Sequence, residues 1–185
     1  MPELPEVETV MQGLKPVLEG RVIERVLLRR EALRFPFPEG FAERLQGRRI
    51  THLRRRAKYI LAALDSADIL LVHLGMTGRF TVFGPQGQKN LGEFYFETGA
   101  AQAGEGPHDH VVISLEGGTR VIYTDPRRFG IMDLFPESQQ ASHKLLAGIG
   151  VEPLGNAFSA AYLAERFRGK AAPLKSALLD QHVVA

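Results

Sequence analysis

The sequence contains no cysteine. Disulfide bonds, thiolate catalysis and cysteine-ligated zinc are therefore excluded within its 185 residues. It also lacks any run of about 18 consecutive apolar residues, so we expect no transmembrane helix. The N-terminus has neither the basic segment nor the apolar core of a secretory signal. Hydrophobic residues make up 44% and charged residues 24%, which is typical of a folded globular protein, and we expect a cytoplasmic location.

The net charge is only +2, but the basic residues are concentrated in one stretch. Residues 21–58 hold twelve Lys and Arg against four Asp and Glu, and eleven of the twelve are arginine. Arginine forks match the geometry of phosphate groups, so one interpretation is a surface that binds a polyanion such as nucleic acid. The alternative is a set of charged strand edges that deter aggregation.

The N-terminal segment, residues 3–18, is predicted to be a helix because its apolar residues recur at three- and four-residue spacing. Pro5 suits the first turn and Gly20 suits a stop just after the last turn. Pro16 predicts a kink or an early end.

Short β-type runs follow Gly20, with turn residues between them. Tight connections at 65–68 and 117–118 predict hairpins, and the spacing leaves no room for the helices that a parallel sheet needs. We therefore expect a mainly β protein with flanking helices, built as a two-layer antiparallel β-sandwich or flattened barrel. The expected strands are 21–30, 48–56, 59–64, 69–74, 79–83, 93–97, 110–115, 119–124 and 131–135, and a short helix is expected at 41–46.

The composition changes after Pro136. Helices are expected over 138–147 and 159–167, each opening on a serine N-cap, and a third from Leu174 to Val184. That last pattern reaches the end of the sequence without a C-cap. We therefore predict an N-terminal domain over 1–135 and the beginning of a helical domain over 136–185, in a chain that is part of a longer protein.

The first residues place an amine beside carboxylates. Removal of Met1 would leave Pro2 with a secondary amine, and the pKa of an α-amino group, about 7.7–8.0 in short peptides, leaves a neutral fraction near pH 7. Such an amine can attack a sugar carbon and form an iminium. Glu3 and Glu6 lie three residues apart on one helix face and could shuttle protons. The alternative is an ordinary acidic helix start.

A second group is TDPRRFG, residues 124–130. Arg127 and Arg128 are followed by Phe129, between Pro126 and Gly130. A planar apolar side chain with adjacent arginines is what a loop needs to wedge open a duplex. The alternative is a simple turn with Phe129 in the core.

Three further residues allow two interpretations each. Met76, in a glycine-flanked turn, is a second wedge or a core filler. His73 binds phosphate or lies in the core. Lys58 is a point charge for phosphate or part of a solvated strand. His108 and His110 are too few ligands for a zinc site, so we expect no metal.

Six segments then occur in one order: PELPEVET, RRAKY, HLGMTGR, HDHV, YTDPRRFG and LLDQ. In this set and order the chain resembles the formamidopyrimidine-DNA glycosylases over its whole length. The resemblance implies a base-excision-repair DNA glycosylase and abasic-site lyase that removes oxidised purines, notably 8-oxoguanine and ring-opened formamidopyrimidines. The implied partner is damaged double-stranded DNA, bound by a monomer in the bacterial cytoplasm, at the nucleoid.

The resemblance also implies catalytic roles. Pro2 would attack the anomeric carbon of the damaged nucleotide, Glu3 would act as general acid and base, and Glu6 would support the amine and its helix. Lys58 and His73 would hold the phosphates that flank the lesion.

The remaining implied roles concern DNA binding. Met76, Arg127 and Phe129 would fill the gap left by the extruded nucleotide, with Arg127 facing the orphaned partner base. Arg128 would contact a further phosphate. Lys175 would lie near the DNA at the start of the helical domain.

The family pattern continues beyond Ala185 with a helix–two-turn–helix element and a zinc finger on four cysteines. We therefore expect no cofactor in this chain, zinc only in the absent part, weak DNA binding and impaired base excision. One alternative is an endonuclease VIII-like glycosylase for oxidised pyrimidines, which shares the Pro2–Glu3 start. The other is a DNA-binding fragment without turnover.

Overall fold

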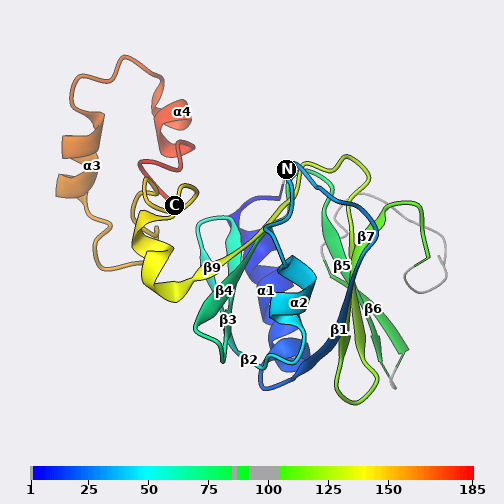
Figure 1. Cartoon of the computed structure of the whole chain (residues 1–185). Coiled ribbons are helices and arrows are strands. Elements are labelled where there is room, and N and C mark those ends of the chain that lie inside the picture. The colour runs from blue at the N-terminus through cyan, green and yellow to red at the C-terminus, as the bar shows by residue number, and fades with distance from the viewer. Residues whose placement is uncertain (1, 85–86, 92–104) are drawn as a thin grey trace. The chain divides into compact units, whose positions relative to one another are not determined.

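The computed structural model describes residues 2–84, 87–91 and 105–185. By its internal contacts the chain divides into two compact units, Met1–Glu137 and Ser138–Ala185, and each is described by itself (Figure 1).

The first unit consists of two antiparallel sheets and two helices (Figure 1). A five-stranded sheet has the order β1-β7-β8-β5-β6, and a four-stranded sheet has the order β2-β3-β4-β9. The expected two-layer antiparallel fold with an N-terminal helix is confirmed. The elements are α1 (Leu4–Leu18), β1 (Ile23–Leu28), α2 (Phe41–Leu45), β2 (Ile50–Arg56), β3 (Tyr59–Leu64), β4 (Asp68–His73), β5 (Arg79–Gly84), β6 (Gly87–Leu91), β7 (Asp109–Leu115), β8 (Arg120–Thr124) and β9 (Ile131–Pro136).

Helix α1 lies between the two sheets and contributes one face to their shared core (Figure 1). Its buried side chains recur at three- and four-residue spacing, as an amphipathic helix requires: Val7, Val10, Met11, Leu14 and Leu18. The expected early end at Pro16 is wrong. The helix continues to Leu18, and the Glu19 N–H still donates to the Lys15 carbonyl at 2.9 Å.

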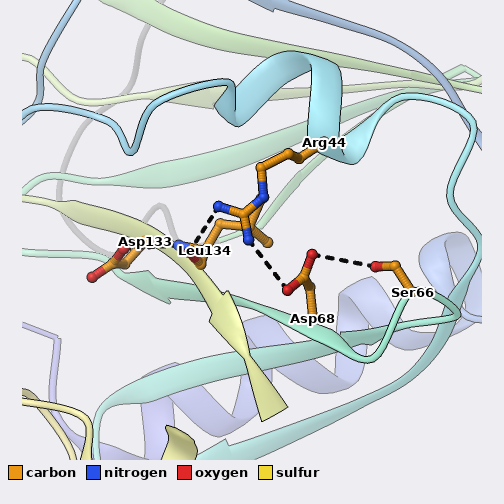
Figure 2. A network of polar contacts seen from close by, with 5 residues as sticks. All are labelled: Arg44, Ser66, Asp68, Asp133 and Leu134. Carbon is orange, nitrogen blue, oxygen red and sulfur yellow. Dashed lines mark hydrogen bonds and ion pairs between the residues drawn. The ribbon is translucent and has the colours of Figure 1, made fainter. Parts of the chain in front are cut away.

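Helix α2 connects the two layers through apolar and polar contacts. Phe41 and Leu45 are buried in the core, while Arg44 turns toward the four-stranded sheet (Figure 2). Its Nη2 lies 3.2 Å from Asp68 Oδ1 on β4, and its Nη1 donates to the Leu134 carbonyl on β9 at 3.4 Å. This half-exposed ion pair contributes about 1 kcal/mol or less, so the apolar face of α2 supplies most of the attachment.

The short β-type runs of the sequence predicted the positions of the strands well. Eight of the nine expected strands are present, with ends within two residues of the prediction. The strand expected at 93–97 lies outside the described residues. Strand β6 was missed because its sequence, GQKNL, has little β-type character. It pairs with β5 alone, at the edge of its sheet.

The second unit contains the 3-10 helix η1 (Glu137–Ser142) and the helices α3 (Ala160–Phe167) and α4 (Leu174–Leu178). The Ser159 N-cap of α3 is present, since its Oγ accepts from the Tyr162 N–H at 3.1 Å. The α-helix expected over 138–147 is wrong. The His143 ring accepts the Leu145 N–H at 3.3 Å, and such local side-chain bonds compete with helix formation.

The helix expected to run on to Val184 is also wrong, because α4 ends at Leu178. Asp180 Oδ1 accepts the His182 N–H at 3.0 Å, which is the turn-forming bond that aspartate favours. Val184 instead forms a parallel bridge with Val151. Within the described part of the chain, no helix has the length and apolar character needed to cross a membrane.

Candidate functional site

The N-terminal end of α1 fixes the backbone next to Pro2. Glu3 is the N-cap residue, and Glu6, the third residue of the helix, closes a capping box by accepting the Glu3 N–H on Oε2 at 2.9 Å. Pro5 occupies the first turn, where its missing N–H needs no partner. Pro2 thus precedes a rigid helix start and is half-buried. Residue 1 lies outside the described residues.

Lys58 meets this helix start from the β2–β3 hairpin. Its Nζ lies 2.7 Å from Glu3 Oε2, and the residue is only 8% exposed. The interpretation of Lys58 as part of a solvated strand is therefore wrong. The Glu3 side chain is 52% exposed, so solvent screens the pair from one side and its main effect is to fix the two groups together. The structure thus gathers Pro2, Glu3, Glu6 and Lys58 in one place.

His73 ends β4 beside the same hairpin, with its ring centroid 5.0 Å from that of Tyr59. Burial, together with the positive charges of Lys58 and Arg34, lowers the pKa of His73 to about 4, so the ring is neutral at pH 7. Its Nδ1 accepts the Gly75 N–H at 3.1 Å. The ring hydrogen must then sit on Nε2, which makes this atom a hydrogen-bond donor.

A cavity of about 630 Å³ opens next to His73. Two loops form much of its wall, residues 74–78 between β4 and β5 and residues 125–130 between β8 and β9. They present large apolar side chains, since Met76 is 41% exposed and Phe129 is 42% exposed. The interpretations that placed Met76 and Phe129 in the core are therefore wrong. The lining residues are Leu33, Arg34, His73, Gly75, Met76, Arg127, Arg128 and Phe129.

The carboxylate of Asp125, which is fully buried, holds these two loops together. Its Oδ1 accepts from the Thr77 hydroxyl at 2.6 Å, and its Oδ2 accepts from the Gly130 N–H at 2.8 Å. Thr77 in turn accepts the Arg127 N–H on Oγ1 at 3.2 Å. One carboxylate therefore sets the position of Met76 relative to the 127–129 segment.

Two glycines allow close approaches in the cavity wall. A Cβ on Gly75, which has φ +66°, would lie 2.4 Å from the Phe129 carbonyl carbon on the other loop. A Cβ on Gly130 would lie 1.8 Å from the Tyr123 hydroxyl oxygen on β8. A side chain at Gly75 would push the two loops apart, and one at Gly130 would push the 125–130 loop away from β8, so the cavity wall depends on both glycines.

Three arginines surround the cavity: Arg34, Arg127 and Arg128. In the part of the chain that the structure describes, none of the three guanidinium groups pairs with a carboxylate. Arg127 instead stacks over the Phe129 ring, 4.7 Å from its centroid. Positive charge beside exposed apolar side chains is suited to an anionic ligand with flat apolar groups.

Arg34 and Leu33 were missed in the sequence, where nothing separates Arg34 from the other arginines of residues 21–58. The structure distinguishes it by its backbone N–H, which donates to the Gly130 carbonyl at 3.1 Å. Lys175 lies exposed in α4 of the second unit.

His108 and His110 support the 125–130 loop. The Asp125 N–H donates to the His108 carbonyl at 3.0 Å. The buried His110 ring lies with Nε2 2.8 Å from the Asp125 carbonyl, and because that oxygen can only accept, Nε2 is the donor.

The first unit is thus a two-sheet protein domain that combines a cationic, partly apolar cavity with an ion-paired helix start, an arrangement suited to an anionic ligand. Residues 1–132 match the family model of the formamidopyrimidine-DNA glycosylase N-terminal domain, and the chain belongs to this family.

Curated relatives extend the match along the whole chain. The formamidopyrimidine-DNA glycosylases of Azorhizobium caulinodans and of Rhodopseudomonas palustris strain TIE-1 are 55% and 52% identical to it over 185 residues. Each alignment covers 100% of this chain and 62% of the relative. The chain therefore spans 62% of the length of these relatives.

Solved structures agree with this assignment. Lactococcus lactis Fpg in complex with DNA containing an abasic site matches with a TM-score of 0.80 and 28% identity, over 100% of this chain and 62% of that chain. The MutM (Fpg) protein of Thermus thermophilus matches with a TM-score of 0.77 and 34% identity, over 100% of this chain and 59% of that chain.

The contact at Gly130 yields a stability prediction. Gly130→Ala places a methyl group against the Tyr123 hydroxyl, and overpacking of this kind costs about 1–3 kcal/mol. Adding Tyr123→Phe removes the hydroxyl and should recover part of the loss. Urea unfolding checks both variants. Gly84→Ala is the control, because its Cβ would meet nothing nearer than 3.4 Å. Equal destabilisation by both alanines would contradict this account of the cavity wall.

The His73 pKa yields a prediction of pH dependence. This pKa is about 4 in the folded chain against an ordinary value of 6.5, so the unfolded chain binds more protons between these values. Stability should therefore fall as the pH is lowered from about 6.5 toward 4. His73→Gln should reduce that slope, as measured by urea midpoints across the window. An unchanged slope in His73→Gln would show that the ring is not held neutral by the fold.

Proposed function

We propose that this chain is the catalytic N-terminal part of a base-excision-repair DNA glycosylase that also cleaves abasic sites. The observation that carries the proposal is the 2.7 Å contact between Lys58 Nζ and Glu3 Oε2 beside Pro2. It puts a carboxylate and an ammonium group in contact at the helix start, next to the residue whose amine would be the nucleophile. The family membership supports the same assignment.

In this mechanism, removal of Met1 frees the Pro2 amine. Its lone pair forms a bond to C1′ of the damaged nucleotide as the glycosidic bond breaks, and the base leaves with that electron pair and takes up a proton. Glu3 accepts the proton that the attacking nitrogen gives up and passes it to the ring oxygen, so that the sugar opens to an iminium, and it can accept protons in the later elimination. Glu6 maintains the geometry through its bond to the Glu3 N–H at 2.9 Å.

The cavity supplies the means of reaching a base inside a duplex. Extrusion of a nucleotide costs a few kcal/mol and leaves a gap in the stack. We assign Met76 and Phe129 to that gap, and Arg127 to the orphaned partner base. Their exposure and their shared position at the cavity support this assignment.

Phosphate contacts would come from donors that converge beside the cavity. His73 offers Nε2–H and Lys58 offers an ammonium group, while Arg128 and Arg34 carry further positive charge. Phosphate contacts of this kind fix the register of a protein on DNA. We also propose that residues 1–135 are the catalytic domain and that residues 136–185 begin a helical domain. Lys175, in the second unit, would add a further phosphate contact from that helical domain.

We propose oxidised purines as the substrates, notably 8-oxoguanine and formamidopyrimidines in double-stranded DNA, acted on by a monomer at the nucleoid in the cytoplasm. The relatives that are 52% and 55% identical are formamidopyrimidine-DNA glycosylases, which favours this class over oxidised pyrimidines. A complex of Lactococcus lactis Fpg with Fapy-dG-containing DNA, which matches with a TM-score of 0.79, also supports it. A comparison of nicking on 8-oxoguanine and thymine-glycol duplexes separates the two.

Borohydride trapping on an abasic-site duplex tests the proposal. An abasic site removes the need for base recognition, so the assay asks only whether the amine and its carboxylates are in place. We expect a covalent adduct with the chain whose mass shows that Met1 is removed, and a reduced yield with Pro2→Gly. No adduct from the processed chain would leave a DNA-binding fragment without turnover.

Arg34 yields a prediction about DNA affinity. If its guanidinium neutralises one phosphate, Arg34→Ala should flatten the slope of log K against log salt concentration by about 0.9. Fluorescence anisotropy between low and moderate salt measures the slope. Arg25→Ala, on the exposed part of β1, is the control and should leave the slope unchanged. A normal slope in Arg34→Ala would remove Arg34 from the interface.

A further inference from the structure

Two ionic contacts join α1 to the β2–β3 hairpin, and the proposed mechanism uses only one of them. Lys58 reaches Glu3 at the start of the helix. Arg55 Nε lies 2.7 Å from Glu8 Oε2, five residues further along, which is about 7.5 Å along a helix axis. The Arg55 side chain is only 14% exposed, while that of Glu8 is 37% exposed, so the contact is shielded from solvent on the arginine side.

Arg55 also holds the backbone that leads into Lys58. Its Nη1 donates to the Ala57 carbonyl at 2.8 Å. Ala57 is fully buried and has φ +49°, a left-handed conformation that disfavours side chains. Such a conformation persists only where its surroundings hold it in place. The Arg55 guanidinium is one such restraint, because it ties this carbonyl to α1.

The sheet itself does not fix Lys58. The β2–β3 ladder ends at the pair Arg56–Tyr59, so Ala57 and Lys58 form the connection beyond the last paired residues. Glu8, by contrast, is firmly placed, since its Oε1 accepts from Gln12 at 2.8 Å while Oε2 takes Arg55. The guanidinium therefore connects a fixed point on α1 to the turn that carries Lys58.

We infer that Arg55 is a positioning residue, which uses Glu8 and the Ala57 carbonyl to hold Lys58 against Glu3 beside Pro2. The catalytic part of this inference rests on the proposed function, whereas the placement of Lys58 does not. Arg55 itself touches none of the proposed reacting groups. Its effect on chemistry passes through Lys58, and a misplacement of about 1 Å in an active site can cost roughly a hundredfold in rate.

The placement is tested by reductive methylation of the 185-residue chain with formaldehyde and a hydride donor, read by peptide mass spectrometry. Lys58, buried and paired, should react slowly compared with the exposed Lys175. In Arg55→Gln and in Glu8→Gln we expect Lys58 labelling to rise several-fold and Lys175 labelling to stay constant. The double variant should match Arg55→Gln, because Glu8→Gln removes no further contact once the guanidinium is gone.

Arg44→Gln is the matched control. It also breaks an arginine–carboxylate pair, with Asp68 at 3.2 Å. This pair is remote from Lys58, because Asp68 begins β4 and it is His73, at the other end of β4, that pairs with Tyr59 beside the Lys58 turn. It should leave Lys58 labelling unchanged, even where its thermal unfolding midpoint falls as far as that of Arg55→Gln. Arg55→Lys should give an intermediate result, since an ammonium group cannot make both bonds of the guanidinium fork.

Borohydride trapping then tests the catalytic part. We expect the trapping rate on an abasic duplex to fall at least tenfold in Arg55→Gln and to be partly recovered in Arg55→Lys. Unchanged Lys58 labelling in Arg55→Gln overturns the inference whether or not the chain is active. Raised labelling with unchanged trapping overturns its catalytic part. Raised labelling in a chain whose wild type gives no adduct supports the placement and contradicts the proposed function instead.

Discussion

The rest of the candidate site depends on the hydrogen bonds that the buried carboxylate of Asp125 accepts. It receives hydrogen bonds from the Thr77 hydroxyl and the Gly130 N–H, on two loops that are far apart in the sequence. A buried carboxylate without such donors would be strongly unfavourable, so the two loops and the charge stabilise each other. The exposed side chains of Met76 and Phe129 are the consequence: the loops cannot turn them inward without breaking these bonds.

The three consecutive strands β2, β3 and β4 connect the residues of the proposed chemistry with those of the proposed DNA contacts. On β3, Tyr59 pairs with His73 of β4. The turn before Tyr59 places Lys58 against Glu3, the N-cap residue of α1. The cavity on one side and the helix start on the other therefore share the β2–β4 segment as a rigid support.

Much of the first unit could be predicted from the sequence, because α1 has a regular apolar period and the strands are short apolar runs bounded by turn residues. The motifs likewise indicated Pro2, Glu3 and Phe129. The Glu3–Lys58 pair and the placement of Arg34 could not be predicted, since both arise from contacts between distant segments. In the second unit, apolar spacing after Pro173 suggested a long helix, but the Asp180 turn ends that pattern, so local hydrogen bonding outweighed periodicity.

The central claim is that the terminal amine carries the chemistry, and it is tested most directly by locating the adduct. After borohydride reduction on an abasic-site duplex, digestion and tandem mass spectrometry identify the modified residue. The account predicts the sugar on Pro2, in the N-terminal peptide. A sugar on Lys58, whose Nζ is the other amine at the site, would contradict it and would make the lysine the nucleophile.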